Sequence, residues 1–69
     1  METIDNTKLT LKAARVNKGY KQEEAAKLLG ISVYTLINYE LGRSFPDVPV
    51  IERIEKVYGI PYHLINFLT

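Results

Sequence analysis

The 69-residue chain has no cysteine and a single histidine, His63. Without cysteine, neither a disulfide framework nor a thiolate metal site is available, and one histidine cannot build a zinc site alone. We therefore expect His63 to be an ordinary surface or half-buried residue, and we expect no metal and no cofactor. The apolar runs are too short to span a membrane, and the first residues lack a signal-peptide pattern. The sequence thus predicts a soluble, cytoplasmic protein.

An excess of charge of one sign is also missing, because nine Lys and Arg residues face eight Asp and Glu residues, a net charge of +1. This balance is much weaker than in strongly basic nucleic-acid-binding proteins. The placement of the charges is still uneven, since Glu52 and Glu55 lie late in the chain and several cations lie earlier. A charge dipole is one reading, and an ordinary solvated mixture of charges is the other. The earlier cations are Lys8, Lys12, Lys18, Lys21 and Arg43.

Enzyme signatures are absent as well. The chain has no glycine-rich phosphate loop and no nucleophile, histidine and acid arrangement, so we predict that it is not an enzyme. Its length fits one domain, near the lower size at which a single core suffices without disulfides or metals. We expect a short polar tail at residues 1–6 and a single domain at residues 7–69.

The most informative segment, residues 22–41, predicts two short helices joined by a tight turn. Strong helix formers fill residues 22–29, and Gly30 favours the left-handed conformation that ends a helix. Ser32 then suits the N-cap of a second helix, and Ile31 before it can pack on Leu36. Two helices joined so tightly cross steeply, and a small residue at the crossing, Ala26, permits it. The expected inward anchors are Ala25, Leu29, Ile31, Leu36 and Tyr39.

The second helix of this pair covers about residues 33–41. Three further helices are predicted around the pair, and the first of them runs from about Thr7 to Asn17. Asp47 caps a fourth helix that ends near Tyr58, and a short last helix covers 62–67. The sequence therefore predicts an all-α, five-helix domain with its helix-turn-helix at the second and third helices. Such a corner also occurs in proteins that never bind nucleic acid.

The helix over 33–41 has an outward face suited to reading DNA. With Leu36 in the core, 100° per residue places the opposite side chains outward. Asn38 can pair bidentately with adenine, whereas apolar side chains can contact thymine methyl groups. A tyrosine can stack on a sugar or donate its hydroxyl. The candidate base-reading residues are Val33, Tyr34, Ile37 and Asn38.

Many correctly spaced residues resemble one known family. The pattern Leu11-x-x-x-Arg15-x-x-Lys18-Gly19-x-x-Gln22-Glu23-Glu24-x-Ala26-x-x-Leu29-Gly30-Ile31-Ser32, followed by Tyr39-Glu40-x-Gly42-Arg43-x-x-Pro46, resembles the lambda-repressor-like helix-turn-helix regulators of Cro/XRE type. The resemblance covers about residues 9–66. It implies a sequence-specific regulator of transcription that binds double-stranded DNA as a dimer, such as a small phage- or mobile-element-type repressor. The base-contacting positions of the family match the four residues named above.

The resemblance also implies roles around that helix. Arg15 and Glu40 would form a partly buried ion pair between the first helix and the recognition helix. Phosphate contacts would come from Gln22 at a helix N-terminus, from Lys18 and Arg43, and from backbone amides near Gly42.

Two features depart from the family pattern. The outward face is unusually apolar, which suggests that thymine methyl groups cover it, that a second protein covers it, or that the helix packs differently. A protein-interaction module on the same fold, such as an antirepressor, adaptor or antitoxin-like protein, is therefore the alternative function. Lys21 occupies an N-cap usually filled by Ser or Thr, and lysine cannot accept a capping hydrogen bond. For self-association we expect contacts from Tyr62, Phe67 and Leu68, with Leu64 and Ile65 closing the core.

Overall fold

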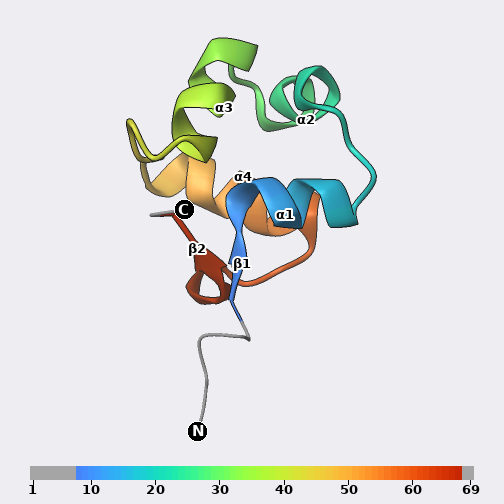
Figure 1. Ribbon diagram of the computed structural model, residues 1–69, viewed down its shortest axis with the longest axis vertical. Coiled ribbons are helices and arrows are strands. Elements are labelled where there is room, and N and C mark those ends of the chain that lie inside the picture. Colours follow the sequence, from blue (N-terminus) through green and yellow to red (C-terminus); the bar gives the residue numbers. More distant parts are fainter. Residues whose placement is uncertain (1–7, 68–69) are drawn as a thin grey trace, which may run out of the picture.

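The computed structural model describes residues 8–67, and most of them are helical (Figure 1). A two-residue strand opens the described part, four α-helices follow, and a 3-10 turn leads to a second short strand. In chain order the elements are β1 (Leu9–Thr10), α1 (Leu11–Asn17), α2 (Gln22–Leu29), α3 (Val33–Glu40), α4 (Val48–Tyr58), η2 (Tyr62–Leu64) and β2 (Ile65–Asn66).

The turn between α2 and α3 forms as the sequence predicts. Gly30 has φ 72°, and the amides of Gly30 and Ile31 donate to the carbonyls of Lys27 and Ala26 at 3.2 and 3.0 Å. These bonds close the C-terminus of α2 and require the left-handed conformation that glycine adopts at least cost. Ser32 Oγ then accepts from the Thr35 amide at 3.1 Å and caps α3. One residue, Ile31, thus separates the C-cap of α2 from the N-cap of α3.

The predicted helix over 62–67 is wrong. Residues Tyr62–Leu64 make a single 3-10 turn, and Ile65 continues in an extended conformation at φ −105° and ψ 129°. The backbone there pairs in parallel with β1, with Leu9 opposite Ile65 and Thr10 opposite Asn66. A β-branched residue suits this half-buried strand better than a helix of one or two turns. The described residues therefore form four α-helices and a small sheet, not the five helices expected from the sequence.

The start of the first helix is also later than predicted. α1 begins at Leu11, because Thr10 is extended and its hydroxyl accepts from the Ala13 amide at 3.0 Å. Thr10 thus serves both as the last residue of β1 and as the N-cap of α1. Residues 1–6, expected to form a polar tail, lie outside the described residues.

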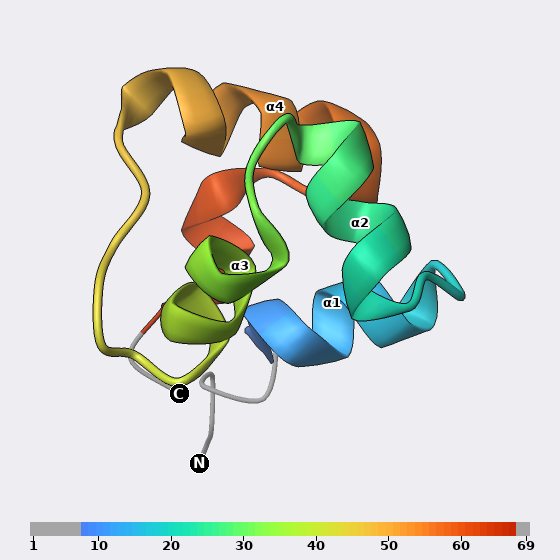
Figure 2. The ribbon, with the colours of Figure 1, turned by 90° about the horizontal axis from the view of Figure 1, so that it is seen from above.

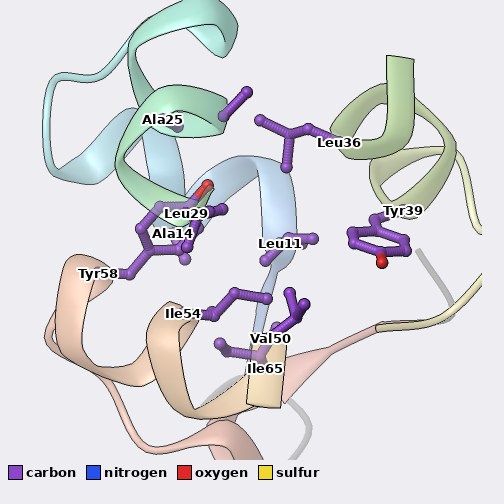
Figure 3. Close-up of a cluster of buried hydrophobic side chains, with 11 residues drawn as sticks. Leu11, Ala14, Ala25, Leu29, Leu36, Tyr39, Val50, Ile54, Tyr58 and Ile65 are labelled. Carbon is purple, nitrogen blue, oxygen red and sulfur yellow. The ribbon is translucent and has the colours of Figure 1, made fainter. Parts of the chain in front are cut away.

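One apolar core joins the four α-helices and the two strands (Figure 3). Its four fully buried large side chains come from α1, α2, α3 and α4, so each helix contributes one of them. Each such side chain stabilises the fold by about 2 kcal/mol through burial. Ile65 is 4% exposed and Leu64 is half-buried, as expected for residues that close the core. The four are Leu11, Leu29, Leu36 and Ile54. Within residues 8–67, no helix has both the length and the apolar character that crossing a bilayer requires.

Tyr58 is a polar exception in this core. It is 3% exposed, its ring centroid lies 6.4 Å from that of Tyr20, and its hydroxyl has no hydrogen-bond partner among the described residues. Burial, with a smaller contribution from the charge of Glu40, raises the pKa of Tyr58 to about 12. Folding therefore favours the neutral form of the Tyr58 side chain, but the hydroxyl itself adds nothing to the free energy of unfolding.

We expect Tyr58→Phe to raise the free energy of unfolding by about 1 kcal/mol, because it removes an unsatisfied buried hydroxyl while keeping the ring. The raised pKa adds a second effect. An unfolded tyrosine loses its proton near pH 10, whereas folded Tyr58 keeps it to about pH 12. The free energy of unfolding of the wild type is therefore unaffected by this group below pH 10 and falls as the pH rises from 10 to 12.

Urea unfolding of both proteins at pH 7 and across this alkaline range measures both effects. The variant should lose less stability than the wild type between pH 10 and 12. A variant less stable than the wild type at pH 7 would show that the hydroxyl has a favourable partner.

Candidate nucleic-acid interface

A buried ion pair fixes α3 against α1. Arg15 Nε donates to Glu40 Oε2 at 2.7 Å, and Arg15 Nη2 donates to Glu40 Oε1 at 3.3 Å. The two residues are only 7% and 8% exposed. Such a forked contact between a guanidinium and a carboxylate is directional, so it sets orientation as well as distance. The structure thus brings together the two residues expected to pair.

The same pair extends into α2 and the turn before it. Gln22 Nε2 donates to Glu40 Oε1 at 3.1 Å, and Arg15 Nη1 donates to the carbonyl of Tyr20 at 2.8 Å. Glu40 therefore receives hydrogen bonds from two helices. Only one of the two hydrogens on Gln22 Nε2 is needed for this bond, so the other remains available to a further acceptor.

The outward side of α3 is what the helical period predicts. Leu36, Tyr39 and Glu40 are buried, whereas Tyr34 on the opposite side is 76% exposed. Leu41, the C-cap residue, is 54% exposed. We call the outward residues the α3 face, and they are Val33, Tyr34, Ile37, Asn38 and Leu41.

Asn38 is the polar centre of the α3 face. Its backbone carbonyl accepts from the Arg43 amide at 2.9 Å. Its side-chain amide has no hydrogen-bond partner within residues 8–67. A half-exposed amide with free donors and a free acceptor is chemically suited to a bidentate partner.

The apolar part of the α3 face is less continuous than the sequence suggests. Val33 is half-buried and packs against the core, and Ile37 is also half-buried. Part of the apolar character thus belongs to the fold itself. Tyr34 and Leu41, at the two ends of α3, are the side chains that remain largely exposed.

The loop after α3 uses its first amides internally. Gly42 has φ 75°, and its amide donates to the Tyr39 carbonyl at 3.1 Å. The Arg43 amide donates to Asn38, as described above, so both amides close the C-terminus of α3. The side chain of Arg43 is exposed. Of the donors expected on this loop, the Arg43 guanidinium has no hydrogen bond or salt bridge to any described residue, so it is available to an external anion.

The exposed side chain of Lys18 lies at the C-terminal end of α4. Its Nζ lies 3.4 Å from where a Cβ on Gly59 would be. A cation is favourable at this negative end of a helix dipole. Its expected contact with a DNA phosphate stays a prediction.

Lys21 places a positive charge at the N-terminus of α2, in addition to being a poor cap. It is exposed at the N-terminus of α2, next to Gln22, and its side chain accepts no capping bond. Glu24 supplies the other half of the cap, since its carboxylate accepts from the Lys21 amide at 2.8 Å. A cation at this helix end opposes the dipole, so it is unfavourable for folding and suited to an external anion. Its position directly before Gln22 in the sequence is the signal that points to it.

The residues expected at a dimer contact differ in their exposure. Tyr62 is 53% exposed and meets His63 edge-on, whereas Phe67 packs partly against the core. Leu68 lies outside the described residues. No group of three or more His, Cys, Asp or Glu side chains within residues 8–67 is placed to hold a metal ion.

Comparisons of the sequence with known proteins identify the family of this chain. The sequence profile of the helix-turn-helix family HTH_3, of Cro/C1 type, matches residues 11–65. The chain belongs to this family, whose members are non-enzymatic DNA-binding proteins.

Two relatives are regulators from phage-derived elements. One is the SPbeta prophage-derived uncharacterized HTH-type transcriptional regulator YonR of Bacillus subtilis, 34% identical over 50 residues, which cover 72% of this chain and 46% of the relative. The other is the cryptic phage CTXphi transcriptional repressor RstR of Vibrio cholerae, 36% identical over 47 residues, 68% of this chain and 42% of the relative. The chain thus matches less than half the length of each. No solved structure gives a significant match.

We expect Arg15→Ala to lower the free energy of unfolding by about 3 kcal/mol, because Glu40 would be left charged, buried and without its main partner. The double variant Arg15→Ala/Glu40→Gln is the matched control, since it removes the orphan charge and keeps a side chain of the same shape. It should recover about 1 kcal/mol or more of the loss. Urea unfolding at pH 7 measures both variants. A double variant no more stable than the single one would contradict this explanation.

Proposed function

We propose that the protein is a sequence-specific regulator of transcription that inserts α3 into the major groove of double-stranded DNA and binds its operator as a homodimer. The observation that supports this most is that the side-chain amide of Asn38, at the centre of the α3 face, has no hydrogen-bond partner among the described residues. A helix placed on the surface, held by buried contacts and presenting a free amide, matches the requirements of direct base readout. One of the two relatives, RstR, is a transcriptional repressor, which supports the role of a repressor.

The base contacts follow from the chemistry of the α3 face. Asn38 would accept from adenine N6 and donate to N7, and Ile37 beside it would contact a thymine methyl group. Val33, partly packed in the core, would contribute the edge of its side chain. Tyr34, at the N-terminal end of α3, would place its hydroxyl on a base or phosphate. These contacts favour A·T base pairs in the half-site.

Phosphate contacts would come from two segments next to α3. At the N-terminus of α2, Gln22 has a spare amide hydrogen and Lys21 adds a charge. In the loop after α3, Arg43 has an exposed side chain. Lys18, exposed at the end of α4, would add a third cation. Such contacts set the register of α3 in the groove and supply much of the affinity.

A second function, protein recognition, is supported by Tyr34 and Leu41, the two exposed apolar side chains of the α3 face. The two functions differ in their response to salt. Phosphate binding weakens steeply as salt rises, whereas apolar contact with a protein does not. Binding to random-sequence and selected duplexes at two salt concentrations therefore separates them. No salt-sensitive DNA binding would favour the protein partner.

We expect Asn38→Ala to lose specificity while keeping non-specific affinity. Removal of one bidentate base contact should weaken binding to the selected duplex by about 1–3 kcal/mol, and binding to random duplex should stay nearly the same. Fluorescence anisotropy with both duplexes measures the difference. Equal losses on the two duplexes would show that Asn38 does not read bases.

We expect Lys21→Ser to stabilise the fold and to weaken DNA binding. Serine accepts the capping bond that lysine cannot, so the free energy of unfolding should rise by about 1 kcal/mol. Loss of one phosphate contact should weaken binding to all duplexes alike and reduce the salt slope by about 1. Lys56→Ser on α4 is the control for charge alone. A salt slope unchanged by Lys21→Ser would remove Lys21 from the interface.

A further inference from the structure

We propose that a cavity beside α1 binds a small apolar carboxylic acid in its ionised form, and that the bound acid withdraws Lys18 from DNA. The cavity has a volume of about 340 Å³ and is lined by residues of β1, α1, the end of α4 and the segment after it. This volume is within the range of pockets that hold small molecules. The site itself is independent of the proposed function, whereas its effect on DNA binding rests on that function.

The cavity lies between α1 and the segment that follows α4, residues 59–64. In Figure 1 this segment runs below α1, and in Figure 2, which is seen from above, it lies behind α2 and α3. Hydrogen bonds hold it in place. Glu55 Oε2 accepts from the Tyr62 amide at 2.7 Å, and the Leu64 amide donates to the Pro61 carbonyl at 3.0 Å. Because this wall is already ordered, a ligand would bind without the entropic cost of ordering it.

The inner part of the cavity is apolar. Its lining includes the side chains of Leu9, Ala14, Ile60 and Leu64 and the ring of Tyr58. Ala14 and Tyr58 are each 3% exposed, so they belong to the core as well as to the cavity. An apolar chain that enters here would leave water for an apolar surrounding, which is favourable. The body of the ligand should therefore be a hydrocarbon.

Two polar side chains of α1 and its C-cap, Asn17 and Lys18, also line the cavity, and both are exposed. Neither side chain has a hydrogen bond or salt bridge to a residue within 8–67. An ammonium and an amide beside an apolar space are complementary to a carboxylate on an apolar body. Lys18 also lies at the negative end of the α4 dipole, which offsets part of its charge. A head group with one negative charge therefore suits the site better than a phosphate with two.

The bound acid would act on DNA binding through Lys18. In the proposed function this side chain is one of the cations that contact DNA phosphates, and a carboxylate paired with it would neutralise its charge. Loss of one phosphate contact weakens binding to all duplexes alike and reduces the salt slope by about 1. The base-reading residues of α3 do not line the cavity, so specificity should stay the same. The acid would thus be an effector that weakens the hold of the protein on DNA.

The experiment uses octanoate as the probe. Octanol and octylamine are the matched probes, because they have the same chain length with no charge or with the opposite charge. Calorimetry gives the affinity of each probe for the wild type, Lys18→Gln, Ala14→Leu and Lys56→Gln, and NMR of the backbone amides locates the bound probe. Lys56 on α4 is the control, since it is an exposed lysine that does not line the cavity.

We expect the wild type to bind octanoate more tightly than octanol or octylamine, with the largest amide shifts at residues that line the cavity. Lys18→Gln should weaken octanoate binding about threefold or more and leave octanol binding nearly the same. Lys56→Gln should behave like the wild type. Ala14→Leu, which fills part of the cavity, should weaken the binding of both probes. Urea unfolding checks that this variant folds, and the amide shifts of the wild type locate the site without it.

The effect on DNA is measured by fluorescence anisotropy with and without saturating octanoate. The acid should weaken binding of the wild type to selected and random duplexes alike and lower the salt slope, and it should leave Lys18→Gln unaffected. An unchanged DNA affinity of the octanoate-bound wild type would overturn its role as an effector.

The site itself is overturned if octanoate does not bind, binds no better than octanol, or shifts amides away from the cavity. These results come from the free protein and say nothing against DNA binding. If the wild type binds no duplex in a salt-dependent way, the proposed function fails, and the role of the acid as an effector fails with it. Binding of octanoate in the cavity would still support the site in that case.

Discussion

The interaction on which the rest of the structure depends is the hydrogen-bonded ion pair of Arg15 and Glu40. It joins α1 to α3, and through Gln22 and Tyr20 it also reaches α2 and the turn before it. The apolar core alone would hold these helices together, but apolar contacts are tolerant of small rotations. Directional bonds to a single carboxylate leave far less freedom. Any base-reading side chain on α3 is thus positioned from inside the domain.

This arrangement links the inside of the fold to its surface in one residue. Gln22 uses one amide hydrogen to hold Glu40 and keeps the other. If a phosphate accepts that second hydrogen, the same side chain would contact DNA and the carboxylate that orients α3. Gln22 would then fix the position of the DNA backbone relative to α3. A fixed distance between the two is what an accurate register of α3 on the DNA requires.

Much of this could be predicted from the sequence, because the signals were local. Gly30 and Ser32 define the tight turn through their own backbone preferences, and the buried side of α3 follows from helical period alone. The pairing of Arg15 with Glu40 came from the resemblance to a known family. By contrast, the strand at Ile65–Asn66 depends on a partner at the other end of the described chain, which no local pattern reports. The position of Lys18 likewise depends on where α4 ends in space.

The short parallel pairing of β1 with β2 has a consequence for the dynamics of the domain. It joins nearly the first described residues to nearly the last, so it is a highly non-local contact and has a large loop-closure entropy to overcome. It has only two residues in each strand, and so it should open more easily than the helices. Because the bonds around Glu40 involve neither strand, amide hydrogens of β1 and β2 can exchange with solvent while α3 stays in place.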